Sequence, residues 1–138
     1  MVFGTFDGIH AGHLDLFRQA KEYGDPSTGS GQAYLIVVVG RDVNIEKIKG
    51  YLPKNSEIER FKEVQKNKLV NEALLGNKED PYKIIEQIKP DIICLGYDQK
   101  YFAEDLEKEL KNRGLDIKIF RMKPFEPEKY HSSIINKK

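Results

Sequence analysis

Short apolar runs alternate with amphipathic stretches along the chain, and this alternation limits the possible folds more than any other feature. The runs rich in Val, Ile or aromatic residues lie at 1–5, 33–40, 91–96 and 117–122, with a weaker one at 72–75. The second and third are almost wholly apolar, which is typical of parallel strands that are covered on both faces. Amphipathic patterns with helical spacing lie at 12–23, 56–70, 81–88 and 102–112.

Strands and helices in alternation, joined by right-handed crossovers, predict a three-layer α/β sandwich around a parallel, Rossmann-like sheet of five strands. Ligands of such sheets bind at the carboxyl ends of the strands, near the point where the strand order reverses. A chain of 138 residues suits one domain and is too short for two ordinary ones. We therefore expect a single domain over 1–138.

A small polar segment at 26–33, with the sequence Pro-Ser-Thr-Gly-Ser-Gly-Gln-Ala, separates the first expected helix from the second strand. It has the composition of a flexible linker. Without it, residue 25 would join residue 34 through a normal short connection. We therefore expect a flexible loop here, inserted or engineered.

The charge balance and the apolar content narrow the class of protein. The chain has 23 Lys and Arg against 22 Asp and Glu, a net charge of +1, which argues against nucleic-acid binding by bulk electrostatics. The longest apolar run, 34–39, falls far short of the roughly 20 residues that span a bilayer. A single cysteine, Cys94, suits a reducing compartment. These features predict a soluble cytoplasmic protein that binds neither nucleic acid nor a membrane.

A glycine-rich block, Gly-Thr-Phe-Asp-Gly-Ile-His-Ala-Gly-His at 4–13, follows the first apolar run and leads into the first expected helix. Its glycines let the backbone approach a ligand, and the N–H groups near Gly12 and His13 form an anion site at the helix start. His10 and His13 lie at the mouth of that site. Taken alone, the two histidines fit phosphate contact, a structural or solvent role, or a metal site.

Two further segments carry groups suited to a nucleotide. The segment 131–137, His-Ser-Ser-Ile-Ile-Asn-Lys, offers the hydroxyls of Ser132 and Ser133 at a possible helix start, although by itself it fits an ordinary N-cap. Asp98 follows the apolar strand at 92–95, where a carboxylate can accept hydrogen bonds from a ribose or a base. A turn or N-cap role for Asp98 stays equally open.

The block at 4–13 resembles the GTFDxxHxGH signature of the nucleotidyltransferase superfamily, and 131–137 resembles its second signature, a Ser-Ser or Ser-Thr pair. Several further stretches make the chain most similar to archaeal-type FAD synthases, namely 41–42, 47–50, 59–60, 90–99 and 130–133. Glycerol-3-phosphate cytidylyltransferases share the first motif but usually carry an arginine at the position of Pro127.

The resemblance implies a nucleotidyltransferase of the HIGH-type fold that transfers AMP from ATP to FMN, giving FAD and pyrophosphate. One alternative is a CTP-dependent cytidylyltransferase that acts on glycerol 3-phosphate or a similar phosphorylated alcohol. Another is a nucleotide-binding module without turnover. Mg²⁺ would arrive on the triphosphate, with no metal site of the protein's own. The oligomeric state stays open, although the relatives are often homodimers.

The resemblance also assigns roles to individual residues. His10 and His13 would contact the α-phosphate and the transition state. Lys47 would serve the β- and γ-phosphates as a catalytic residue, with Lys49 as the second choice, although both lysines also fit a solvated basic loop. The expected nucleotide-binding residues are Thr5, Phe6, Gly12, His13, Lys49, Asp98, Ser132 and Ser133.

Overall fold

The computed structural model describes residues 1–23, 33–80, 82–96 and 100–122 of the chain. Three of the predicted nucleotide-binding residues, Asp98, Ser132 and Ser133, lie outside the described residues, as does the expected loop at 26–33 apart from Ala33. None of the described helices is long and apolar enough to cross a membrane.

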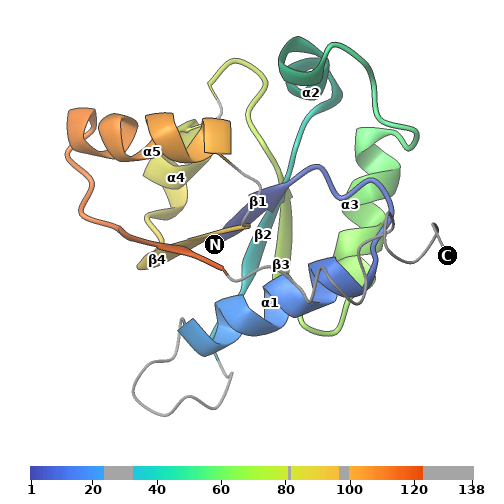
Figure 1. The fold of residues 1–138 in the computed structure, drawn as a ribbon, viewed down its shortest axis with the longest axis horizontal. Coiled ribbons are helices and arrows are strands. Elements are labelled where there is room, and N and C mark those ends of the chain that lie inside the picture. The colour runs from blue at the N-terminus through green and yellow to red at the C-terminus, as the bar shows by residue number, and fades with distance from the viewer. Residues whose placement is uncertain (24–32, 81, 97–99, 123–138) are drawn as a thin grey trace, which may run out of the picture.

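Five parallel strands form one sheet in the order β3-β2-β1-β4-β5, which confirms the predicted fold (Figure 1). The strands are β1 (Val2–Gly4), β2 (Ile36–Val39), β3 (Glu72–Leu75), β4 (Ile92–Leu95) and β5 (Lys118–Arg121). The central strand β1 has β2 on one side and β4 on the other. The strand order therefore reverses at β1, and the predicted ligand site falls at its carboxyl end.

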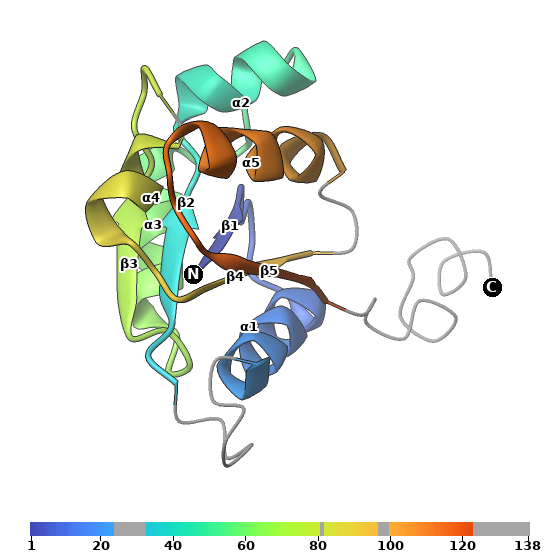
Figure 2. The same cartoon turned by 90° about the vertical axis from the view of Figure 1, so that its left-hand side faces the viewer.

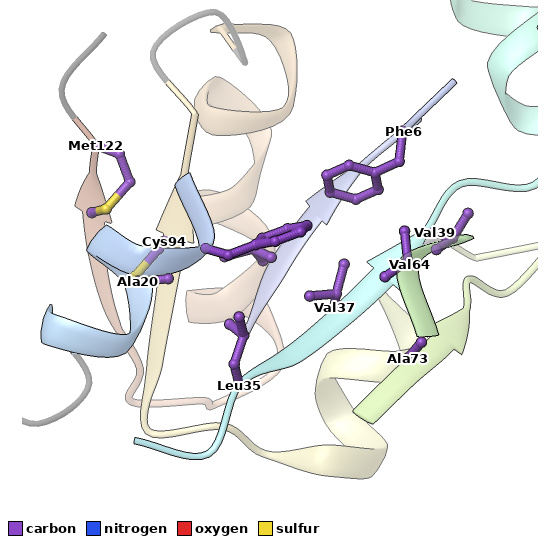
Figure 3. Packing of buried hydrophobic residues seen from close by; sticks show 11 residues of the cluster. Phe6, Ala20, Leu35, Val37, Val39, Val64, Ala73, Cys94 and Met122 are labelled. Atoms are coloured by element: carbon purple, nitrogen blue, oxygen red, sulfur yellow. The ribbon is translucent and has the colours of Figure 1, made fainter. Parts of the chain in front are cut away.

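Helices cover both faces of the sheet. On one face α1 (Ala11–Tyr23) and α3 (Glu57–Lys66) pack on strand residues such as Val2, Val37 and Cys94 (Figure 3). On the other face α4 (Lys83–Ile88) and α5 (Lys100–Asn112) pack on residues such as Phe3 and Val38. Figure 2 shows α1 below the sheet and α5 above it. Neighbouring strand residues enter opposite layers because successive side chains in a strand alternate in direction.

The helix expected over 56–70 is shorter in the structure, ending at Lys66. It begins with a capping box, in which the Ser56 side chain and the Glu59 backbone N–H bond to one another and the Glu59 carboxylate accepts from the Ser56 N–H. It ends because Asn67 is extended, and its side-chain oxygen accepts from the N–H of Leu69, 2.9 Å away. Such a local bond competes with continuation of a helix.

The lysines at 47 and 49 lie on a helix, α2 (Asp42–Lys49), so the alternative of a solvated basic loop was wrong about the local structure. Asp42 lies in the first turn and both lysines in the last, where each charge complements the helix dipole. Gly50 ends the helix in the left-handed conformation, at φ +82°, and donates to the carbonyl of Glu46. The apolar spacing missed this helix because it is short and Val43 is exposed, leaving no clear buried stripe.

Candidate active site

The loop that leaves β1 is shaped by a close contact between Gly4 and Phe6. A Cβ atom on Gly4 would lie 2.7 Å from Cζ of Phe6, so only glycine fits beneath that ring. Phe6 itself has φ +54°, and its side chain is buried against Phe17, with ring centroids 5.5 Å apart. The Phe6 side chain therefore fixes the course of the loop from inside the core. The resemblance assigns Phe6 to nucleotide binding. Because its ring is buried, only the main chain of Phe6 is available for that contact.

The side chains of His10 and His13 both cap the start of α1. The Nδ1 atom of His10 accepts from the backbone N–H of Gly12, 3.0 Å away. The Nδ1 atom of His13 accepts from the backbone N–H of His10, 3.2 Å away. The two rings are stacked, with centroids 3.8 Å apart. The pair is thus a variant of a capping box built from imidazoles: His10 at the N-cap accepts from the second helical N–H, and His13 at the third position accepts from the N-cap N–H.

The cap decides which nitrogen of each neutral ring carries the proton. An Nδ1 atom that accepts a backbone hydrogen bond has no hydrogen of its own, so the neutral ring carries its hydrogen on Nε2. The Phe6 and His13 rings make an edge-to-face contact, with centroids 5.2 Å apart, and this contact further fixes the orientation of the His13 ring. Both histidines thus have their Nε2–H donors set by the backbone of the helix start, where anions are favoured.

The end of α2 brings a positive charge to the same loop. Nζ of Lys49 donates to the hydroxyl of Thr5 over 3.3 Å, which joins two of the predicted nucleotide-binding residues. Lys47 is exposed and lies two positions earlier on the helix, so it projects roughly 200° around the helix axis from Lys49. The structure therefore brings Lys49 to the β1 loop, and the catalytic role of Lys47 stays a prediction.

Asp7 fastens the loop to the segment before α3. Its carboxylate accepts from the backbone N–H groups of Lys54 and Asn55, at 2.8 and 2.9 Å, and from the Asn55 side-chain amide at 2.9 Å. The hydrogen bond from the Asn55 backbone, aided by the other two, lowers the pKa of Asp7 below its usual value. This carboxylate is thus occupied by the chain's own backbone.

Arg60 of α3 lies behind the β1 loop, and the sequence offers it only as a weaker phosphate-binding candidate than Lys47 and Lys49. Its side chain is fully buried, and among the described residues it is the only buried charged one. The guanidinium donates to the carbonyls of Thr5, Gly40 and Asn55 at 2.7, 2.9 and 3.0 Å and to Asp42 at 2.5 Å. An available signal was that Arg60 stands four residues before buried Val64, on the inward stripe of an amphipathic helix.

The whole sequence matches one known protein family. The model of the family described as cytidylyltransferase-like matches residues 1–138, the full length of the sequence. The chain belongs to the cytidylyltransferase-like family. Its histidine cap is therefore the local structure that the motif at 4–13 adopts in this member of the family.

Relatives of this cytidylyltransferase-like chain include curated FAD synthases from archaea. The FAD synthase of Aciduliprofundum boonei is 41% identical over 125 residues, which cover 91% of this chain and 78% of the relative. That of Thermoplasma acidophilum is 38% identical over 138 residues, covering 100% and 91%. Among solved structures, the lipopolysaccharide core biosynthesis protein of Thermoplasma volcanium is 34% identical with a TM-score of 0.78, covering 91% of this chain and 96% of that one.

This cytidylyltransferase-like chain has one hollow beside the β1 loop and another beyond β3, and neither is bordered by an imidazole. One, of about 460 Å³, lies between the β1 loop and α3 and is bordered by Phe6, Gly8 and Ile9 together with residues of α3 and Asn55. The other, of about 400 Å³, lies beyond β3 and is bordered by Arg41 and Gly76 among others. The predicted partners of the histidines across the site, Asp98, Ser132 and Ser133, fall outside the described residues. Among the described residues, the structure brings together the histidine cap, Thr5 and Lys49 at the carboxyl ends of β1 and β2.

Proposed function

We propose that this chain is an FMN adenylyltransferase, which transfers AMP from ATP to FMN and yields FAD and pyrophosphate. The observation that carries the proposal is the similarity to curated FAD synthases over nearly the whole chain, at 38–43% identity for several of them. The site adds independent support, because the histidine cap lies at the carboxyl end of β1, where the strand order reverses.

The reaction needs no nucleophile from the protein. A phosphate oxygen of FMN attacks the α-phosphorus of ATP, a new P–O bond forms, and the bond from that phosphorus to the pyrophosphate oxygen breaks. Negative charge spreads over the α-phosphate oxygens and the leaving pyrophosphate, so alignment and fixed positive charge supply the catalysis.

The histidine cap suits this task. In the proposal the Nε2–H groups of His10 and His13 donate to the α-phosphate oxygens, and they need no reorientation because the backbone holds both rings. The start of α1 adds its positive dipole to the same phosphate. The ammonium of Lys49, held at Thr5, lies where it can meet the charge of the leaving pyrophosphate.

Mg²⁺ enters this proposal with the nucleotide. Within the described part of the chain no group of three or more His, Cys, Asp or Glu side chains is placed to hold a metal ion. In the proposal the ion binds on the phosphates of the triphosphate. When bound there, it neutralises part of the charge that develops during phosphoryl transfer.

The proposal includes parts that rest on the sequence. Asp98 would contact the ribose or base, Ser132 and Ser133 would hold phosphates, and Lys47 would assist Lys49. The chain would act as one domain, with a loop at 26–33, in the cytoplasm as a homodimer. Cys94 is the single cysteine of the sequence, and its thiol is free and buried, which supports a reducing compartment. Burial raises the pKa of this thiol.

A pyrophosphate-release assay that crosses ATP and CTP with FMN, glycerol 3-phosphate and phosphocholine tests the function. We expect turnover with ATP and FMN and a product that co-migrates with FAD. Turnover only with CTP and a phosphorylated alcohol would identify a cytidylyltransferase instead. Nucleotide binding by calorimetry without pyrophosphate release from any pair would identify a binding module.

A further inference from the structure

Arg60 has a set of contacts that a purely stabilising ion pair would not need. Of the four hydrogen-bond acceptors that the described residues offer it, Asp42 is the charged one, and the other three are neutral backbone carbonyls. A buried charge is expensive to desolvate, and replacing a buried ion pair with apolar residues is often neutral or stabilising. Stability alone therefore does not account for an arginine in this place.

The three carbonyls belong to three different segments, two of which carry groups of the site. Thr5 follows β1 and receives the ammonium of Lys49 on its hydroxyl. Gly40 follows β2 and leads directly to α2, the helix that ends at Lys49. A single NH1 group of Arg60 donates to both carbonyls, at 2.7 and 2.9 Å. The ends of the two strands are thus held to one nitrogen atom.

The surroundings of Arg60 hold it in this position. Asp42 and Glu57 exchange hydrogen bonds, each carboxylate accepting from the other residue's backbone N–H at 3.2 and 3.0 Å. Arg41 pairs with Glu57 at 3.2 Å. The Asp7 carboxylate ties the β1 loop to Asn55, whose carbonyl Arg60 also binds. Figure 1 shows the loop after β1 passing beside α3.

We propose that Arg60 is a positioning residue for nucleotidyl transfer. It fixes the end of β1 against the start of α2, so that the histidines of the β1 loop and Lys49 address the same triphosphate. Its guanidinium touches neither substrate and works through the two backbone segments. This inference rests on the proposed function, because it deepens the account of that same site.

Replacing Arg60 with lysine tests the idea, because an ammonium keeps the charge but cannot serve four acceptors in a planar fork. We expect R60K to remain folded by circular dichroism and to lose kcat by on the order of tenfold or more, because small misplacements of reacting groups are costly. R113K is the matched control, because it makes the same change in another arginine with several bonds, and it should keep the wild-type kcat.

A double-mutant cycle with K49M distinguishes positioning from simple support of the fold. If Arg60 acts by aligning Lys49 with the histidines, R60K should reduce kcat much less in the K49M background than in the wild type. Additive losses of kcat, or an R60K protein with unchanged kcat and KM and only a lower Tm, would overturn the proposal. If R60K fails to fold, D42N takes its place in the same cycle, with the same outcomes decisive.

A failure of the proposed function can be distinguished from a failure of the positioning role of Arg60. A wild-type protein without turnover of ATP and FMN would refute that function, and the cycle would then be measured as ATP binding by calorimetry. Coupling between positions 49 and 60 in the Kd for ATP would uphold the positioning of Lys49 by Arg60. Independent effects on that Kd would overturn it.

Discussion

Arg60 and Arg113 both gather several hydrogen bonds, but they differ in what they bind. Arg113 follows α5, and within the described residues its side-chain hydrogen bonds go to the carboxylates of Asp80, Glu86 and Glu109. Its guanidinium also lies over the ring of Tyr82, 5.7 Å from the centroid. Its side chain remains 20% exposed, whereas that of Arg60 is 0% exposed. Most partners of Arg60 are backbone carbonyls at the strand ends.

The difference separates two ways of using an arginine. Carboxylates at the ends of side chains can move together with the guanidinium that they bind. The Arg113 cluster therefore joins α4 and α5 without fixing the position of the backbone. The three carboxylates, led by Asp80, raise the pKa of Arg113, which keeps it cationic. Backbone carbonyls cannot move without their strands, so Arg60 defines a geometry. Changes near Arg60 should therefore alter turnover, and changes near Arg113 should alter only stability.

The largest expected effect is on the histidines, which lie on the Arg60 side of the molecule. Replacing His13 with alanine should lower kcat by on the order of 10²–10³, by analogy with the loss of one oxyanion donor. H10A should have a smaller effect, because His13 also lies within the positive start of α1. The Kd for ATP should change much less than the single-turnover rate, since the donors act mainly in the transition state.

His10→Asn separates the cap from the chemistry. Asparagine is a good N-cap and can accept from the Gly12 N–H in place of Nδ1, so H10N should keep the thermal stability of the wild type. It should also keep more activity than H10A, although less than the wild type. Near-normal rates in H10A and H13A would remove the histidines from catalysis. Equal losses in rate and in ATP binding would make them ground-state ligands.

The two lysines of α2 give the next effect. Lys49→Met should weaken ATP binding by about 1.5–3 kcal/mol, the usual worth of a hydrogen bond to a charged group. Lys47→Met should change it less, because only Lys49 is held at Thr5. Calorimetric titration of both variants at the same salt concentration checks this order. A larger loss in K47M would return the main phosphate role to Lys47.

Asp7 should make the thermal stability of the protein depend on pH in the acidic range. Its folded pKa is lowered, mainly by the Asn55 backbone, so its contribution is present above the ordinary carboxyl pKa of about 3.9. That contribution is lost as the pH falls through the lower folded pKa. Asp7→Asn should therefore flatten the fall of Tm between about pH 5 and pH 2. Asp116→Asn, at an exposed site, is the control, and an unchanged acid slope in D7N would contradict the prediction.

The smallest effect on activity should come from Arg113. Arg113→Met should leave kcat and both KM values unchanged and lower the Tm modestly, because solvent-accessible ion pairs contribute little. Arg60→Met should destabilise the fold much more, by about 3–5 kcal/mol, since it removes a buried cation that serves Asp42 and three backbone carbonyls. Denaturant unfolding of both variants measures the contrast. An R113M protein with reduced kcat would erase the distinction between the two arginines.

Strands β2 and β4 were predictable because almost all of their residues are apolar. A central strand of a parallel sheet is covered on both faces, so few polar side chains fit there. The weak run at 72–75 is also a strand, β3, in register with all four residues of β2. Helix α2 was not predictable from spacing, since caps and charges rather than a buried stripe define it. The cap of His10 and His13 was predictable only as a helix start, because the sequence does not orient a ring.

Arg60 shows the main limit of reading residues singly. Its carbonyl acceptors lie at Thr5, Gly40 and Asn55, and carbonyls are present at every position of a chain. No side-chain pattern marks which of them will converge on one guanidinium. Only the strand order, which places the ends of β1 and β2 together, makes that convergence visible.

The position of β1 in the middle of the sheet has a consequence for how the chain assembles. Val2 pairs with Val37 on one side and with Cys94 on the other, so its second partner is made long after its first. During synthesis β1, β2 and β3 can associate while the other edge of β1 still exposes unpaired backbone groups. That edge closes only when β4 emerges from the ribosome. A nascent chain is therefore most prone to aggregate in the interval between the two pairings, and contacts so distant in sequence also make refolding slow.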